Sequence, residues 1–164
     1  MQHTERIAVP PLALQLCWEG DRIHEILLSW TSRPGRPQNP SPQAARLQSD
    51  LARYLRGEKV AWPRLPLDWD RLSPFARQVL TVLRDQVGWG EWIAYSELAR
   101  RCNNPNAARA VGAVMRANPW PLVVPCHRVL GKKGDLTGFG GGLALKKLLL
   151  DLEGTFPSCK EGES

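Results

Sequence analysis

The hydrophobic pattern of the chain changes near residue 70, and this change limits what the chain can fold into. Before it, the short apolar runs "LALQLCWEG" and "IHEILLSW" flank the turn signal "GDR", which predicts two strands. A proline-rich loop and the helical pattern "QAARLQSDLARYLRG" follow. Beyond residue 70, short helical patterns alternate with turns. We therefore expect an α/β domain over residues 1–70, a mainly α domain over residues 71–156 and a disordered tail over residues 157–164.

Three helices are predicted in succession after residue 71. "SPFARQVLTVLRDQV" has Ser73 as a candidate N-cap and Pro74 at the first helical position. "SELARRC" and "AARAVGAVMRAN" lie on either side of the turn "NNPN", with Ser96 and Asn106 as their expected N-caps. This order is typical of helix-turn-helix domains, although many other helix pairs share it. A buried strand at "LVV" and a helix that ends at Gly154 complete the domain.

Much of the second helix of this pair consists of small residues, and Arg109 is the one long side chain near its positive end. Small side chains permit close packing against another helix, and they equally permit close approach to a bulky partner such as a DNA groove. The sequence pattern leaves both interpretations open.

The positive charge is concentrated in one part of the chain. The formal net charge is +6, and Glu97 is the only acidic residue between positions 95 and 134. The basic residues there are Arg100, Arg101, Arg109, Arg116, Arg128, Lys132 and Lys133. A solvated basic face could have this composition, but the imbalance favours a polyanionic partner such as nucleic acid.

The remaining composition predicts a cytoplasmic protein with reduced thiols. No apolar stretch is long enough to cross a membrane, and the N-terminal residues do not have the pattern of a secretion signal. The spacing of the cysteines fits neither a CxxC pair nor a disulfide framework. The cysteines are Cys17, Cys102, Cys126 and Cys159. His3, His24 and Cys17 lack a convincing fourth ligand, so no metal site is predicted.

The stretch "PCHRV" places Cys126 directly before His127. Such a cysteine can be a core residue, a metal ligand or a nucleophile. A nucleophile needs a base and the base needs an orienting partner; His127 and the distant Glu153 could fill these roles. In a regular strand Cys126 and His127 would point to opposite faces, so this chemistry requires a bend in the backbone.

"PCHRV", together with "YSELARRCNNPNAARAVGAVMRANPWP" before it and "LTGFGGGLALKKLLLDLEG" after it, resembles the O6-alkylguanine-DNA alkyltransferases, which repair DNA by direct reversal. The resemblance runs from about Val87 to Gly154 without an obvious gap. The N-terminal part is similar only in its sheet-and-helix character. The resemblance implies a ribonuclease H-like first domain followed by a winged helix-turn-helix-like domain.

The resemblance also implies a reaction. Cys126 would accept the alkyl group from O6 of guanine once per molecule, as a suicide methyltransferase. His127 would deprotonate Cys126 through a water, and Glu153 would hold His127. Tyr95 would donate to a guanine ring nitrogen, beside the phosphate that rotates as the base flips. Asn118 would tie the active-site turn to the recognition helix.

The same resemblance assigns the DNA and substrate contacts. A recognition helix would enter the minor groove, and Arg109 would fill the space left by the flipped base. The expected DNA contacts are Tyr95, Ala107, Arg109, Ala110, Gly112, Arg116 and Arg128. The expected pocket consists of the carbonyls of Cys126 and Val129, Met115, Phe139 and the amide of Gly140. Phe139 lacks the hydroxyl of the tyrosine that many family members have, and Gly140 replaces a serine of some members, which would open the pocket to larger alkyl groups.

The implied partner is double-stranded DNA that contains O6-alkylguanine, with O4-alkylthymine as a second substrate. We expect a monomer that can bind DNA cooperatively, with no cofactor. Alkyltransferase-like proteins, which bind alkylated DNA without transfer, are the main alternative, but they have tryptophan where this chain has Cys126. A helix-turn-helix regulator would not need Tyr95, "PCHRV" and Glu153 together, and a Cys-His hydrolase would not explain the small-residue helix.

Overall fold

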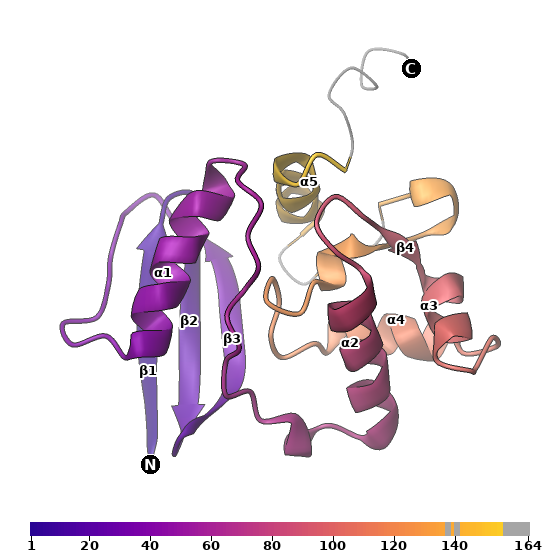
Figure 1. The fold of residues 1–164 in the computed structure, drawn as a ribbon, viewed down its shortest axis with the longest axis horizontal. Helices are drawn as coiled ribbons and strands as arrows, with labels where there is room; N and C mark the ends of the chain where they lie inside the picture. The colour runs from indigo at the N-terminus through magenta and orange to yellow at the C-terminus, as the bar shows by residue number, and fades with distance from the viewer. Residues whose placement is uncertain (137–138, 140–141, 156–164) are drawn as a thin grey trace. The chain divides into compact units, whose positions relative to one another are not determined.

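The structure is a computed structural model of the 164-residue chain, and it describes residues 1–136, 139 and 142–155. The chain forms two compact units (Figure 1). The first unit comprises Met1–Ser73 and Pro119–Val123, and the second comprises Pro74–Asn118 and Val124–Ser164. The division lies three residues after the predicted boundary. The return of 119–123 to the first unit was not anticipated.

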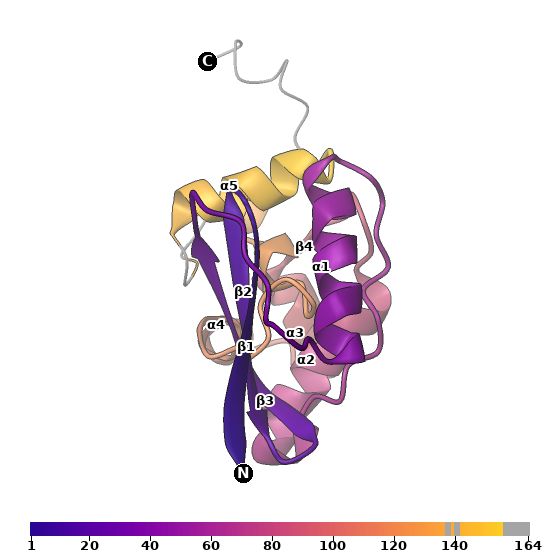
Figure 2. The same cartoon turned by 90° about the vertical axis from the view of Figure 1, so that its left-hand side faces the viewer.

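The first unit is a three-stranded antiparallel sheet covered on one face by a helix (Figures 1 and 2). Its elements are β1 (Gln2–Val9), β2 (Leu12–Glu19), β3 (Arg22–Trp30), α1 (Pro42–Leu55) and the 3-10 turn η1 (Trp69–Arg71). The strands expected at "LALQLCWEG" and "IHEILLSW" and the helix after them are confirmed. β1 was missed, because its first half is polar and exposed and shows no apolar run.

A buried carboxylate ties α1 to the sheet. Ser41 caps α1 by accepting a hydrogen bond from the Ala44 amide at 3.1 Å. The amide and hydroxyl of Ser41 both donate to the Glu5 carboxylate at 2.7 Å, and the Trp18 indole donates to it at 2.8 Å. Burial raises the pKa of Glu5, but these three hydrogen bonds outweigh it and leave the pKa below its usual value.

The second unit contains the predicted helices and a short parallel strand pair. Its elements are α2 (Pro74–Gln86), β4 (Ile93–Ala94), α3 (Tyr95–Arg101), α4 (Ala108–Arg116), η2 (Cys126–Arg128), β5 (Val129–Leu130), η3 (Lys132–Gly134) and α5 (Leu143–Leu152). Helices α2, α3 and α4 pack on one another, and β4 pairs with β5 in parallel. No helix of the described residues is long and apolar enough to span a membrane. A mixed α/β fold is therefore confirmed at this level of detail.

Three local predictions for this unit were wrong. Helix α3 starts at Tyr95 and α4 at Ala108, so neither Ser96 nor Asn106 is an N-cap. The residues directly before these helices are alanines without a side-chain cap. The "LVV" segment is a turn in which Leu122 has a φ of 75°, because three nearby prolines remove the backbone donors that a strand needs.

The two serines give a direct test of these assignments. Ser41→Ala removes a helix cap and a hydrogen bond to a buried carboxylate, so the free energy of unfolding should fall by about 2 kcal/mol. Ser96→Ala removes an exposed hydroxyl that caps nothing, and its effect should stay within about 0.5 kcal/mol. Urea unfolding of both variants measures this difference. Equal losses would contradict the observed start of α3.

Candidate active site

Cys126, the predicted nucleophile, lies on a tight turn. Cys126, His127 and Arg128 form the single 3-10 turn η2. The Cys126 amide donates to the Val124 carbonyl at 2.8 Å, and the Arg128 amide donates to the Pro125 carbonyl at 3.0 Å. The backbone thus bends where the chemistry requires it, because Pro125 cannot continue an extended hydrogen-bond ladder. Cys126 and His127 are both buried, with exposed fractions of 5% and 0%.

His127 is oriented by the carboxylate that follows α5. Its Nε2 lies 2.6 Å from Oε2 of Glu153, and both side chains are fully buried. Glu153 is the C-cap residue of α5, and Gly154, with a φ of 72°, ends that helix. Nε2 carries a proton and donates a hydrogen bond to the carboxylate, which leaves Nδ1 as the unprotonated nitrogen of the neutral imidazole. Nδ1 has no hydrogen-bond partner among the described residues. The imidazole is therefore held in the form that can accept a proton at Nδ1.

Arg128 completes a buried charge pair. Its Nε donates to Oε1 of Glu153 at 2.7 Å, and one terminal nitrogen donates to the Val87 carbonyl at 2.8 Å. We expected Arg128 to contact DNA, but its side chain is buried and its guanidinium is used inside the unit. The physical reason is that a buried carboxylate needs a buried counter-charge. The prediction that Arg128 contacts DNA is therefore wrong.

The surroundings keep Glu153 charged and His127 uncharged. Burial raises the pKa of Glu153, but the hydrogen bonds and charges of His127 and Arg128 outweigh it and lower that pKa to about 2. Burial lowers the pKa of His127, and this effect exceeds the opposing attraction of Glu153. The carboxylate is ionised and the imidazole neutral near pH 7. A neutral imidazole can accept a proton, which is what a general base requires.

The thiol itself keeps its proton in the resting site. Burial raises the pKa of Cys126, while a hydrogen bond from the Asn118 side chain and the positive charge of Lys146 act against this rise. The Asn118 amide also donates to the Val124 carbonyl at 3.0 Å, so this residue contacts the turn that carries Cys126. The site therefore stabilises a thiolate once it forms, without ionising the thiol in advance.

Lys146 is a site residue that sequence reasoning missed. It is buried on α5, and its Nζ donates to the Val129 carbonyl at 2.7 Å and lies 6.0 Å from the centre of the Tyr95 ring. Burial lowers the pKa of Lys146 to about 8. A signal was present, because Leu149 and Leu150 lie three and four residues further on the same helix face. A lysine within an apolar stripe is a candidate for a buried functional charge.

The predicted pocket residues are only partly described. Met115 is buried on α4, and Val129 is buried next to the reactive turn. The carbonyl of Cys126 accepts from the Val129 amide and that of Val129 accepts from Lys146, which leaves each oxygen one further lone pair. Phe139 is half-buried. Gly140, whose amide was expected to face O6 of guanine, lies outside the described residues.

Helix α4 presents a narrow exposed face. It consists of Arg109, Ala110, Ala113, Arg116 and Ala117, which recur at helical spacing and include no acid. Ala107 and Gly112 are buried instead. A Cβ added at Gly112 would lie 3.5 Å from a terminal nitrogen of Arg116 and 4.0 Å from the Tyr95 ring. These are ordinary van der Waals distances, so a methyl group would fit there. Neither Gly112 nor Ala107 lies on the surface expected to face DNA.

The other basic residues and the other cysteines are not part of this site. Arg100 and Arg101 on α3 both pair with Glu97, at 2.6 and 3.3 Å. Cys17 and Cys102 are free and buried, and Cys159 lies outside the described residues. Within the described part of the chain, no three His, Cys, Asp or Glu side chains gather as a candidate metal site.

The comparisons with known proteins agree with this geometry. The family model of the 6-O-methylguanine DNA methyltransferase DNA-binding domain matches residues 74–155, half of the chain. A methylated-DNA–protein-cysteine methyltransferase of Salmonella typhimurium is 37% identical over 139 residues, which cover 84% of this chain and 80% of that protein. The chain belongs to the methylated-DNA–protein-cysteine methyltransferase family.

Further members of the methylated-DNA–protein-cysteine methyltransferase family are similarly close. The Haemophilus influenzae protein is 41% identical over 116 residues, and the match covers 71% of this chain but only 64% of that protein. The crystal structure of Mycobacterium tuberculosis O6-methylguanine methyltransferase is 33% identical, with a TM-score of 0.74 and 96% of each chain covered. A structure of the same mycobacterial protein in complex with DNA also has a TM-score of 0.74, with 93% of this chain covered.

The charge of Lys146 should be measurable through the reactivity of Cys126. Lys146→Met removes a positive charge that stabilises the thiolate, so the pH midpoint for alkylation of Cys126 by iodoacetamide should move upward. The neighbouring exposed Lys147→Met is the matched control and should leave the midpoint unchanged. Peptide mapping of Cys126 across a pH series measures both. If the pH midpoint of Cys126 alkylation is the same in both variants, Lys146 does not stabilise the thiolate.

Proposed function

We propose that this chain repairs DNA by transferring the alkyl group of O6-alkylguanine to Cys126, once per molecule. One observation carries the proposal: Cys126 directly precedes a buried, neutral His127 whose Nε2 is held by Glu153 and whose Nδ1 is unpartnered among the described residues. A repeatedly acting Cys-His hydrolase would need a similar pair. The family membership and the relatives named methylated-DNA–protein-cysteine methyltransferase favour alkyl transfer.

The proposed step balances as a nucleophilic displacement. The Cys126 thiol gives its proton to Nδ1 of His127 through a bridging water, and the sulfur forms a bond to the alkyl carbon. The bond between that carbon and O6 of guanine breaks, and its electron pair stays on the guanine ring. Tyr95 donates a proton to a ring nitrogen, and the proton on Nδ1 of His127 passes through solvent to restore Tyr95, so both residues return to their starting states. The products are a stable thioether on Cys126 and unmodified guanine, so no step restores the thiol.

The DNA interface is proposed to be the exposed face of α4. Arg109 and Arg116 supply positive charge there, while Ala110, Ala113 and Ala117 keep the helix narrow enough for a minor groove. Arg109 would fill the space that the flipped guanine leaves. Tyr95 begins α3 and is packed near Gly112 of α4, which is compatible with a role at both the base and its phosphate.

Several finer assignments accompany this proposal. They are a ribonuclease H-like first unit, a winged helix-turn-helix-like second unit, a monomer that binds DNA cooperatively, O4-alkylthymine as a second substrate and a cytoplasmic location. The packing of α2, α3 and α4 supports the helix-turn-helix description. The sheet covered by α1 is compatible with the description of the first unit. The other assignments stay predictions.

The transfer can be read directly by mass. Incubation with a duplex that contains one O6-methylguanine should add about 14 Da, one methylene in net mass, to Cys126 and saturate at one per protein, because the thioether is stable. Intact-mass measurement with peptide mapping gives both numbers, and Cys126→Ala is the control. Tight binding without a mass change would instead place the chain with the non-enzymatic binders of alkylated DNA.

A second experiment separates base flipping from chemistry. Arg109→Ala should lower the rate of alkyl transfer from a methylated duplex by about tenfold to a hundredfold, because no side chain then fills the space that the flipped base leaves. Reaction with free O6-benzylguanine should change by less than about twofold, because a free base needs no extrusion from a stack. Arg100→Ala, which removes an exposed arginine paired with Glu97, is the control. Equal losses on both substrates would reject the role of Arg109.

A further inference from the structure

The segment between α4 and the reactive turn belongs to a different unit from its two neighbours. Pro119–Val123 is part of the first unit, whereas Asn118 and Val124 are part of the second. The Asn118 side chain donates to the Val124 carbonyl at 3.0 Å, so a hydrogen bond joins the two residues that flank this segment. Cys126 follows only two residues after Val124. Contacts that fix the conformation of residues 119–123 therefore also restrict the backbone that directly precedes Cys126.

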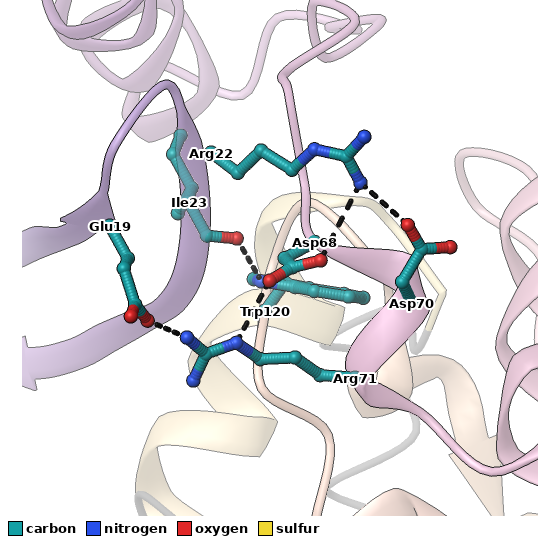
Figure 3. Close-up of polar contacts among 7 residues, drawn as sticks. All are labelled: Glu19, Arg22, Ile23, Asp68, Asp70, Arg71 and Trp120. Carbon is teal, nitrogen blue, oxygen red and sulfur yellow. Dashed lines mark hydrogen bonds and ion pairs between the residues drawn. The ribbon is translucent and has the colours of Figure 1, made fainter.

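Trp120 anchors this segment to the sheet of the first unit. It is fully buried, and its indole nitrogen donates to the Ile23 carbonyl at 3.1 Å (Figure 3). Its ring also packs on that of Trp69, with 4.9 Å between ring centres. The Ile26 amide donates to the Pro119 carbonyl at 2.8 Å. Ile23 and Ile26 belong to the edge strand β3, whose outward backbone groups need such partners.

The residues before η1 build the other side of this anchoring site. The Ile23 amide donates to the Pro66 carbonyl at 2.8 Å, and the Asp68 amide donates to the Ile23 carbonyl at 3.0 Å. The Ile23 carbonyl thus accepts from both Asp68 and Trp120, which uses both of its lone pairs.

A network of ion pairs surrounds the same site (Figure 3). Arg22 pairs with Asp68 at 3.6 Å and with Asp70 at 2.9 Å, and Arg71 pairs with Asp68 at 2.8 Å and with Glu19. Single exposed pairs contribute little to stability, but this network joins the end of the β2–β3 hairpin to η1 through shared partners. It therefore holds η1, and with it Trp69, next to Trp120.

The backbone of the segment is itself held in an unusual conformation. Leu122 is fully buried and has a φ of 75°, in the left-handed region that leucine seldom adopts. Such a conformation persists only where the surrounding structure fixes it. The segment is therefore a docked structural piece and does not behave as a free linker.

We propose that Trp120 is a positioning residue for Cys126: its docking on Ile23 and Trp69 holds 119–123 in one conformation and so limits the conformations of the turn that presents the thiol. This inference rests on the proposed alkyl transfer, although Trp120 contacts neither substrate nor reacting atoms in it. Alkyl transfer depends on a close and aligned approach of sulfur to carbon, and small displacements reduce its rate steeply.

The first test compares two tryptophans of the same unit. Trp120→Phe removes the indole hydrogen bond but keeps a ring next to Trp69. Trp18→Phe is the matched control: Trp18 pairs with Ile23 in the β2–β3 ladder, but its buried indole donates to Glu5 at 2.8 Å and not to the groups that hold the segment. At saturating O6-methylguanine duplex, the rate constant for transfer should fall about tenfold in Trp120→Phe and less than about twofold in Trp18→Phe. The duplex Kd should stay within about twofold in both.

A second readout does not depend on DNA repair. Iodoacetamide alkylation of Cys126 across pH should show a midpoint that moves upward in Trp120→Phe, because a loosened turn aligns the thiolate less well with Asn118 and Lys146. Trp69→Leu, which alters a half-exposed ring contact, should shift it in the same direction. Trp18→Phe should leave it unchanged.

The outcomes are distinguishable. If the Trp120 and Trp18 variants lose transfer rate to a comparable extent and the pH midpoint of Cys126 alkylation does not change, the positioning role is wrong. Trp120 would then contribute only to the stability of the fold. If the wild-type protein transfers no methyl group, the proposed function fails. The iodoacetamide profile then decides the positioning role by itself: a shift confined to the Trp120 and Trp69 variants supports it, and the absence of one overturns it.

Discussion

In the second unit, one buried carboxylate accepts hydrogen bonds from two side chains, the neutral imidazole of His127 and the guanidinium of Arg128. Glu153 is inaccessible to solvent, and each of its oxygens accepts a short hydrogen bond, one from His127 and one from Arg128. Both partners come from the turn of Cys126, so Glu153 fixes the end of α5 to the reactive turn. Removing one member of such a buried pair typically destabilises a protein by about 3–5 kcal/mol, because the remaining charge has no partner. Structure and chemistry thus rely on the same group.

This arrangement explains how a buried thiol can be reactive without being ionised beforehand. Burial favours the neutral forms of Cys126 and His127, as it does for any ionisable group taken out of water. Arg128 balances the charge of Glu153, so the carboxylate can orient the imidazole while the imidazole stays neutral. Lys146 then provides positive charge where a thiolate would form. In the proposed reaction, the proton transfer from Cys126 to His127 would occur when an alkylated base is bound.

The small residues of α4 lie on two faces that the sequence could not separate. Gly112 is buried near Tyr95 and Arg116, inside the unit. Ala110 and Ala113 are exposed between Arg109 and Arg116, where their small size leaves the helix face narrow. Helical periodicity shows which residues share a face, but only the packing of α2 and α3 decides which face is covered.

The sequence by itself determined the elements whose information is local. The strands of the β2–β3 hairpin, helix α1 and the helices of the second unit follow from apolar periodicity and turn residues, and "PCHRV" identified Cys126 and His127 as neighbours. Strand β1 pairs with its chain neighbour β2, but its polar, exposed first half hid it from the apolar pattern. The role of Arg128 and the burial of Lys146 came only with the tertiary structure, because each depends on residues far apart in the chain. The same holds for Pro119–Val123, whose assignment to the first unit depends on a hydrogen bond between Trp120 and Ile23 that no local pattern encodes. Local sequence specifies backbone conformation and hydrophobic faces, whereas the partner of a buried polar group is decided only when the chain has folded around it.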